Sequence, residues 1–412
     1  MRLKPMFLSL LLAACVDAAD DAGNGPATGN MAPLAPVVRD SAGVAIYEHP
    51  ADAFARAPRF VMSKKPVTEI KGSDVESDLS RVWQPMVLAD GRVVMFADGS
   101  LLVFGPTGDL VERIGRTGEG PGEFRAGNLY SGLGDTLLVE DGGNMRLSLL
   151  VPGKGVVRSL PIPKSARQHV MSIMGQTATG GFLVATTGFA MTPDLVKNPV
   201  VQWRTARLDV GGDSVTLLDS IPGPVLAMRD GFPDIVRHAP IPVTVVWDGE
   251  FLISRAGHWE LSRMRPDGAV AARTVVPLVR RAVDPAGLAG EHDAQFHWAL
   301  EMAKSGRLEG KTPDTSYMRK RIKDAPRADS LPLIAKALVG PDGVAWIKDG
   351  GYIYAEPTWA WTAVKKDGTI LGRLVGKGKD PVVAFGADRV MLKSEDADGF
   401  VTFRVHTLTV NR

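Results

Sequence analysis

Cysteine is almost absent from this chain: Cys15 is the only one among 412 residues. A single thiol excludes an intrachain disulfide, so the folded part is held together by packing. Aromatic residues make up only 7% of the chain, and 48 basic residues nearly balance 46 acidic ones, for a formal net charge of +2. Nucleic-acid binding favours a clearly basic domain, so we expect no nucleic-acid partner.

Long hydrophobic runs are also missing near the amino end. The apolar run 6–12 is far shorter than the ~20 residues that a membrane-spanning helix needs. It follows Arg2 and Lys4 and precedes small residues, which is typical of a secretory signal. Residues 16–36 are rich in Gly, Pro, Ala and Asp, which favours a flexible tether.

The sequence LAAC, which ends at Cys15, resembles the lipobox of bacterial lipoproteins. The resemblance implies a signal peptide at 1–14, cleavage before Cys15 and lipid attachment to that residue. We therefore expect a lipidated Cys15 with its tether at 15–36, and a folded domain at 37–412. The membrane partner would be reached through this anchor, on the periplasmic face of an outer membrane or at the cell surface. The alternative is an ordinary signal peptide in which Cys15 is incidental.

Beyond the tether, short β-type runs alternate with Asp-Gly and Gly-Gly turns. The segments 67–96, 110–139 and 370–392 share one pattern: a strand, a Gly-rich link, a strand, a tight turn and a strand. Repeats of this kind predict an all-β fold, and repeated four-strand units select a six-bladed β-propeller. The six predicted blades lie near 81–115, 128–164, 170–222, 242–279, 331–375 and 382–410.

The last predicted blade has only three strands of its own. An early strand at 60–70 matches the outermost strand of the other blades. Closing the ring with that strand would satisfy an open edge, so residues 60–70 are predicted to pair with 400–410.

The stretch 113–124, RIGRTGEGPGEF, raises the question of a phosphate-binding loop. Its glycines do not follow G-x-G-x-x-G, and a strand follows rather than a helix, so a dinucleotide site is not supported. We interpret the stretch as a structural link between blades, in which glycine supplies positive φ or close backbone approach. The residues of this link are Gly115, Gly118, Gly120, Pro121, Gly122, Glu123 and Phe124.

The decapeptide GRTGEGPGEF at 115–124 resembles the signature loop of bacterial six-bladed β-propellers related to NHL-repeat proteins. Many members of that group are exported lipoproteins. The resemblance implies a fold and a compartment, and it supplies no catalytic residues, because the signature is a structural loop.

Propeller ligands usually bind at one mouth of the central channel. The links between blades share that mouth with the loops between second and third strands, and such loops carry function on a rigid scaffold. The candidate binding residues there are Arg116, Glu119, Arg125, Arg319, Lys320 and Arg321.

The segment 280–330 departs from a plain propeller. It predicts a helical insertion between the fourth and fifth blades, with Phe296 and Leu300 on one apolar face. Residues 304–327 hold eight basic and three acidic residues. This insertion is interpreted either as a lid or docking face, or as a solvated helix pair that patches one blade.

Three histidines, His169, His238 and His258, fall near the same predicted mouth. Resemblance to propeller lactonases and peptide-amidating lyases, which carry an axial metal, implies that dispersed histidines could hold a divalent ion. No cofactor is favoured, however, because loop histidines are also expected by chance. The chain has no G-x-S-x-G element and no other sequence-local catalytic signature.

We therefore favour a non-catalytic, lipid-anchored binding scaffold for a protein, peptide or glycan at the cell envelope. The alternative is a propeller hydrolase or lyase, lactonase-like or amidating-lyase-like, with an axial divalent metal.

Overall fold

The computed structural model describes most of the chain from residue 32 onward. The described ranges are 32–162, 171–177, 179–186, 200–209, 215–255, 257–303, 314–352, 358–378, 381–396 and 399–411. Cys15 and His169 lie outside them. Within these ranges the chain is mostly β, and none of the helices is long and apolar enough to cross a bilayer.

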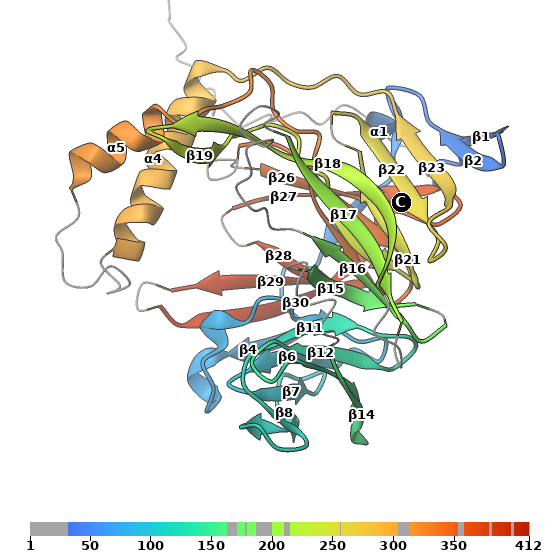
Figure 1. The fold of residues 1–412 in the computed structure, drawn as a ribbon, viewed down its shortest axis with the longest axis vertical. Helices are drawn as coiled ribbons and strands as arrows, with labels where there is room; N and C mark the ends of the chain where they lie inside the picture. Colours follow the sequence, from blue (N-terminus) through green and yellow to red (C-terminus); the bar gives the residue numbers. More distant parts are fainter. Residues whose placement is uncertain are drawn as a thin grey trace, which may run out of the picture.

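Most strands form antiparallel groups of four that follow one another along the chain (Figure 1), and β3 (Arg59–Met62) joins the last two groups into one nine-stranded sheet. The first sheet contains β5 (Met86–Val87), β6 (Val93–Ala97), β7 (Ser100–Phe104) and β8 (Leu110–Ile114). The next contains β11 (Gly127–Ser131), β12 (Leu137–Asp141), β13 (Arg146–Val151) and β14 (Gly155–Pro161). The third contains β15 (Met171–Gln176), β16 (Phe182–Thr186), β17 (Val200–Leu208) and β18 (Val215–Arg229), and β18 continues into a ribbon with β19 (Phe232–Ile235).

The remaining strands repeat the pattern. The fourth sheet contains β20 (Thr244–Trp247), β21 (Glu250–Ser254), β22 (Trp259–Met264) and β23 (Val270–Val276). The fifth contains β24 (Ile334–Val339), β25 (Ala345–Asp349), β26 (Thr358–Val364) and β27 (Ile370–Lys377). The last combines β28 (Val382–Phe385), β29 (Arg389–Glu395) and β30 (Val401–Val410) with the early strand β4 (Thr68–Lys71).

The inner strands of successive sheets are neighbours around a closed circle, and all of them are first strands except β6, the second strand of the first sheet. Strand β11 lies beside β6 and β15, β20 lies beside β15 and β24, and β28 lies beside β24 and β5. Apolar side chains fill the space between adjacent sheets; Val103 on β7, for example, belongs to one cluster with Leu129 and Val139 of the next sheet. This circular arrangement of four-stranded sheets is a β-propeller.

The ring is closed by strands from both ends of the chain. Strand β3 (Arg59–Met62) pairs with β30, with Phe60 opposite Val410 and Met62 opposite Leu408. Strand β4 continues along the same partner, with Lys71 opposite Thr402. The predicted pairing of 60–70 with 400–410 is confirmed, except that the early segment is two strands rather than one.

Several amino-terminal elements were not predicted from the sequence. The hairpin of β1 (Val37–Ser41) and β2 (Val44–Glu48) adds to the fourth sheet, because β2 pairs in parallel with β23. The short helix α1 (Ala53–Arg56) follows, and its Phe54 packs edge-on against Trp259, with the ring centroids 5.1 Å apart. The backbone of Leu34 also pairs with Ile370, so the chain joins the fold three residues before the predicted boundary at 37.

Short 3₁₀ turns and two further helices complete the described elements. The turns are η1 (Gly72–Asp74) and η2 (Leu79–Arg81). Between β23 and β24 lie α4 (Pro285–Met302) and α5 (Thr315–Lys323). Asp284 caps α4 by accepting a hydrogen bond from the Gly287 amide at 2.8 Å, and Pro285 starts the first turn.

Candidate functional site at the link end

One end of the ring collects the connections between sheets, and we call it the link end. Each first strand starts there and each second strand returns there, so the loops between second and third strands share this end with the links. Helices α4 and α5 and strand β19 belong to such links and lie together at one side of the molecule (Figure 1).

The glycine-rich link between β8 and β11 folds back on itself at this end. Its two short strands, β9 (Arg116–Thr117) and β10 (Glu123–Phe124), pair in parallel. Gly115 has φ +84°, and a Cβ there would lie 2.6 Å from the Phe124 ring. Glycine at this position therefore permits both the left-handed backbone and the close approach of the Phe124 ring.

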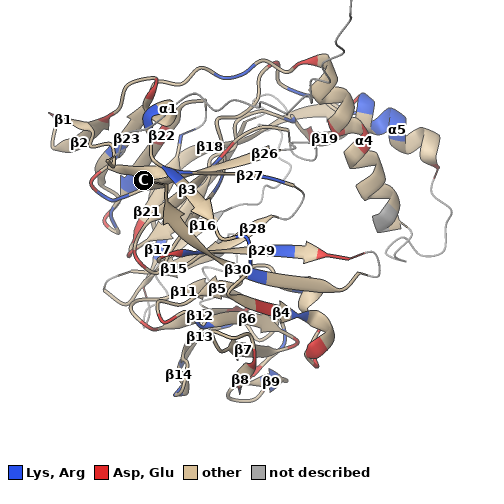
Figure 2. Cartoon of the chain, turned by 180° about the vertical axis from the view of Figure 1, so that it is seen from behind, with Lys and Arg blue, Asp and Glu red and all other residues tan. Residues whose placement is uncertain are grey.

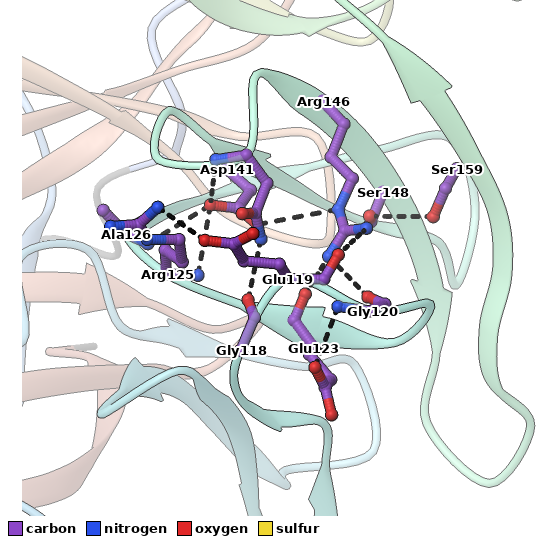
Figure 3. A network of polar contacts seen from close by, with 11 residues as sticks. Gly118, Glu119, Gly120, Glu123, Arg125, Ala126, Asp141, Arg146, Ser148 and Ser159 are labelled. Atoms are coloured by element: carbon purple, nitrogen blue, oxygen red, sulfur yellow. Dashed lines mark hydrogen bonds and ion pairs between the residues drawn. The ribbon is translucent and has the colours of Figure 1, made fainter.

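A buried carboxylate and a half-buried guanidinium hold the link in place (Figure 3). The Asp141 carboxylate is fully buried and accepts hydrogen bonds from the amides of Arg125 at 3.3 Å and Ala126 at 3.2 Å. The Arg146 guanidinium lies 3.6 Å from the Asp141 carboxylate and donates to three carbonyls of the link, those of Glu119, Gly120 and Glu123. The link is thus pinned by contacts with the sheet that follows it.

The charged residues predicted to line the mouth mostly pair with one another. Arg116 pairs with Glu123 at 2.7 Å, and Arg125 pairs with Glu119 at 2.8 Å. The Gly120 amide, which donates to the Glu123 carboxylate at 2.8 Å, lowers the pKa of Glu123, and Arg116 lowers it further. These groups stabilise the link and one another.

The basic residues of α5 are arranged differently. Arg319 turns toward α4, where it lies 3.5 Å from Asp293 and 3.7 Å above the centre of the Phe296 ring. Lys320 and Arg321 are exposed to solvent, and Figure 2 shows basic residues along α5. Arg319 thus contacts α4, whereas its neighbours Lys320 and Arg321 face solvent.

The three candidate histidines have separate environments. His238 is buried in the link before β20, whereas His258 is exposed in the turn before β22. His169 falls outside the described ranges. Within those ranges no three His, Cys, Asp or Glu side chains gather closely enough to hold a metal ion.

His238 instead forms a buried pair with a helix residue. Its Nε2 lies 2.8 Å from Oε2 of Glu291 on α4, and the two side chains are 0% and 1% exposed. The backbone of His238 has φ +59°, which non-glycine residues rarely adopt. The Arg280 guanidinium donates to the His238 carbonyl at 3.2 Å.

Tyr352 joins this pair to the start of α4. Its ring meets His238 edge-on, with centroids 5.6 Å apart, and its hydroxyl donates to the Asp284 carboxylate at 2.8 Å. The Gly287 amide lowers the pKa of Asp284, and the Tyr352 hydroxyl lowers it further. A Cβ at Gly287 would lie 2.3 Å from the Tyr352 ring, so the ring packs directly on the helix backbone.

Exposed aromatic and cationic residues also lie on β19 and α5. Phe232 on β19 is 73% exposed, and Tyr317 on α5 is 56% exposed. Phe232 pairs across the ribbon with Arg229, whose guanidinium donates to the Arg321 carbonyl of α5 at 2.8 Å. We call Phe232, Tyr317, Lys320 and Arg321 the α5 surface. Sequence reasoning found its two basic residues and missed its two aromatic ones, although Tyr317 stands one helical turn before Lys320.

Comparisons with known proteins show similarity only at the level of overall shape. No protein-family model matches the chain, and no curated protein matches its sequence. Among solved structures, a member of the DUF4221 family from Bacteroides vulgatus aligns with TM-score 0.47 and 8% identity, over 85% of this chain and 99% of that chain. A putative exported protein from Bacteroides fragilis aligns with TM-score 0.46 and 10% identity, over 89% and 100%. A streptogramin B lyase aligns with TM-score 0.37 and 11% identity, over 85% and 98%.

Proposed function

We propose that this chain is an exported, six-bladed β-propeller that acts as a non-catalytic binding scaffold for a protein, peptide or glycan. The closed circle of inner strands supports the blade count, because it passes through each group of four strands once. In this proposal α4 and α5 are an insertion between the fourth and fifth blades, and the link at 115–124 has a structural role.

The proposed anchor is the lipid on Cys15. Residues 1–14 would be removed as a signal peptide, and residues from Cys15 to the first pairing at Leu34 would form the tether. The anchor is supported by the resemblance of LAAC to a lipobox and by the polar composition of the residues that follow. The propeller would then act at the cell envelope, on the periplasmic face of an outer membrane or at the cell surface.

The observation that carries the binding proposal is the α5 surface. Phe232 and Tyr317 are large and more than half exposed, and the exposed Lys320 and Arg321 lie on the same helix as Tyr317. On α5, Tyr317 is three residues from Lys320 and four from Arg321, so the three share one face. Exposed aromatic residues with arginine are typical of interaction surfaces.

The positive charges of this surface favour a negatively charged partner. Helix α5 has four basic residues and no acidic residue between Thr315 and Lys323. By contrast, the charged side chains of the glycine-rich link are already paired, as for Arg125 with Glu119. The partner is therefore proposed to contact α5 and β19 rather than the link.

Arrays of peptides and of glycans, probed with the purified full chain, test this proposal. The double variant Phe232→Ala/Tyr317→Ala should lose the ligands that the unchanged chain retains. Val157→Ala is the matched control, because Val157 is an exposed apolar residue on the outer strand β14. Equal binding by the double variant and the unchanged chain would refute the proposal, as would ligand turnover by the unchanged chain.

A further inference from the structure

Three exposed cations of α5 have no acidic partner among the described residues. Lys320, Arg321 and Lys323 are exposed, and none of them forms an ion pair within that part of the chain. The exposed Asp324 follows them but pairs with none of the three. Of the basic residues of the helix only Arg319 pairs, with a carboxylate of α4. The last turns of α5 therefore present positive charge to an anionic partner.

The segment that precedes the fold has the opposite charge. Residues 16–33 contain Asp17, Asp20 and Asp21 and neither Lys nor Arg. The three carboxylates fall within five consecutive positions, and the four cations of α5 fall within five as well, from 319 to 323. The two clusters therefore match in sign and in sequence span. We call residues 17–21 the acidic segment.

The chain enters the fold at the two sheets that α4 and α5 connect. Leu34 pairs with Ile370 of the fifth sheet, and β2 pairs with β23 of the fourth. Leu34 follows Asp21 by 13 residues, which span at most about 43–47 Å when extended. A tether of this kind gives its end an effective concentration of roughly 1 mM at a surface within reach. A contact between exposed charges can therefore form even though each ion pair is weak.

We propose that the acidic segment docks on the basic residues of α5, so that the free protein covers its own α5 surface. The segment would compete there with the negatively charged partner, and this regulatory role rests on the function proposed above. The contact itself belongs to the free chain and can be measured without any partner.

Disulfide trapping tests the contact, because Cys15 is the only native thiol and stands two residues before Asp17. Thr315→Cys adds a second thiol at the start of α5, where Thr315 is exposed. The matched control is Val157→Cys on the outer strand β14, where Val157 is also exposed. The full chain is produced without export, so that Cys15 keeps its thiol.

At low ionic strength the disulfide between positions 15 and 315 should form rapidly. Changing the three aspartates to Asn should slow it about tenfold, because three exposed ion pairs are lost together. Salt at roughly 0.5 M should abolish the difference by screening. Trapping at position 157 should be the same with either segment. Equal rates at position 315 for the Asp and Asn segments would overturn the contact.

An exchange of charges separates an ionic contact from the mere reach of the tether. Changing Lys320, Arg321 and Lys323 to Glu should slow trapping at position 315 as much as the Asn segment does. Changing the three aspartates to Lys in that same chain should restore the fast rate, because the attraction returns with reversed signs. A rate that stays slow would overturn the proposal. Circular dichroism checks that each variant is folded.

A fluorescent peptide of six aspartates, added to the chain with native residue 315, tests the regulatory role. The chain with the Asn segment should bind this probe about tenfold more tightly than the unchanged chain, because its α5 surface is no longer covered. Equal affinities would overturn the competition. Array ligands without trapping would overturn the contact and leave the proposed function standing, whereas trapping without array ligands would support the contact and count against that function.

Discussion

Nε2 of His238 lies 2.8 Å from Oε2 of Glu291, and this pair joins the link before β20 to helix α4 in the protein interior. Removing one partner leaves the other buried without its hydrogen bond, so Glu291→Ala should cost about 3 kcal/mol of unfolding free energy. Glu291→Gln retains an acceptor and should cost about 1 kcal/mol. Urea denaturation measures both values, and equal stability of Glu291→Ala and the unchanged chain would contradict a stabilising pair.

Gly115 and Gly122 both have positive φ, but only Gly115 is crowded. A Cβ at Gly115 would lie 2.6 Å from the Phe124 ring, whereas a Cβ at Gly122 would have no neighbour within 4 Å. Gly122→Ala should therefore cost only the backbone strain, about 1 kcal/mol. Gly115→Ala adds the clash and should cost about 3 kcal/mol. Urea denaturation compares the two, and similar losses would show that space at Gly115 does not matter.

Burial raises the pKa of Glu140 above its ordinary 4.5, and the hydrogen bond from Tyr130 only partly opposes this. As the pH rises above 4.5, the unfolded chain ionises Glu140 before the folded chain does, so the folded state loses stability. Glu140→Gln removes this penalty. Its stability advantage over the unchanged chain should grow with pH up to the raised pKa and then stay constant.

Glu69 is the matched control for the Glu140 prediction, because Arg404, 2.8 Å away, lowers its pKa. Its contribution to stability is present above pH 4.5 and is lost in acid, so Glu69→Gln should be less stable than the unchanged chain near neutral pH only. Chemical denaturation across pH 3–8 measures both curves. Slopes of the same sign for Glu140→Gln and Glu69→Gln would contradict the assignment.

Ring closure by β3 can be tested with proline. Val61 lies opposite Thr409 in β3, which pairs with β27 on one side and β30 on the other. Proline in such an inner strand removes a ladder hydrogen bond, and Val61→Pro should cost about 3 kcal/mol. Val157→Pro should cost less than about 1 kcal/mol, because Val157 lies at a register shift in the outer strand β14. Equal losses of Tm would show that closure by β3 contributes little.

Much of the fold could be predicted because its signals are local. Alternating apolar residues and Asp-Gly turns predict the strands, and the missing fourth strand of the last blade predicts the partner at 60–70. The addition of the hairpin β1–β2 to the fourth sheet was not predicted, since the parallel pairing of β2 with β23 joins segments more than 200 residues apart.

The polar contacts of the link end could be predicted only in part. His238 and Glu291 are 53 residues apart, and no local sequence pattern around either residue indicates that they pair. Lys336 of β24 stands opposite Lys348 of β25 because of the register between the two strands, which shifts between Ile334 and Lys336. A one-residue difference in register moves a side chain to the other face of a sheet, so the sequence pattern alone could not place Lys336 opposite Lys348.

The most direct test of the binding proposal is photo-crosslinking in cells that produce the full chain. A photoreactive residue replaces Tyr317 on the α5 surface in one variant and Val157 on β14 in the other. The proposal predicts a discrete crosslinked species from position 317 that is absent from position 157, and that is lost when Lys320 and Arg321 are also changed to Glu. No adduct at 317, or the same adducts from both positions, would contradict a binding surface on α5.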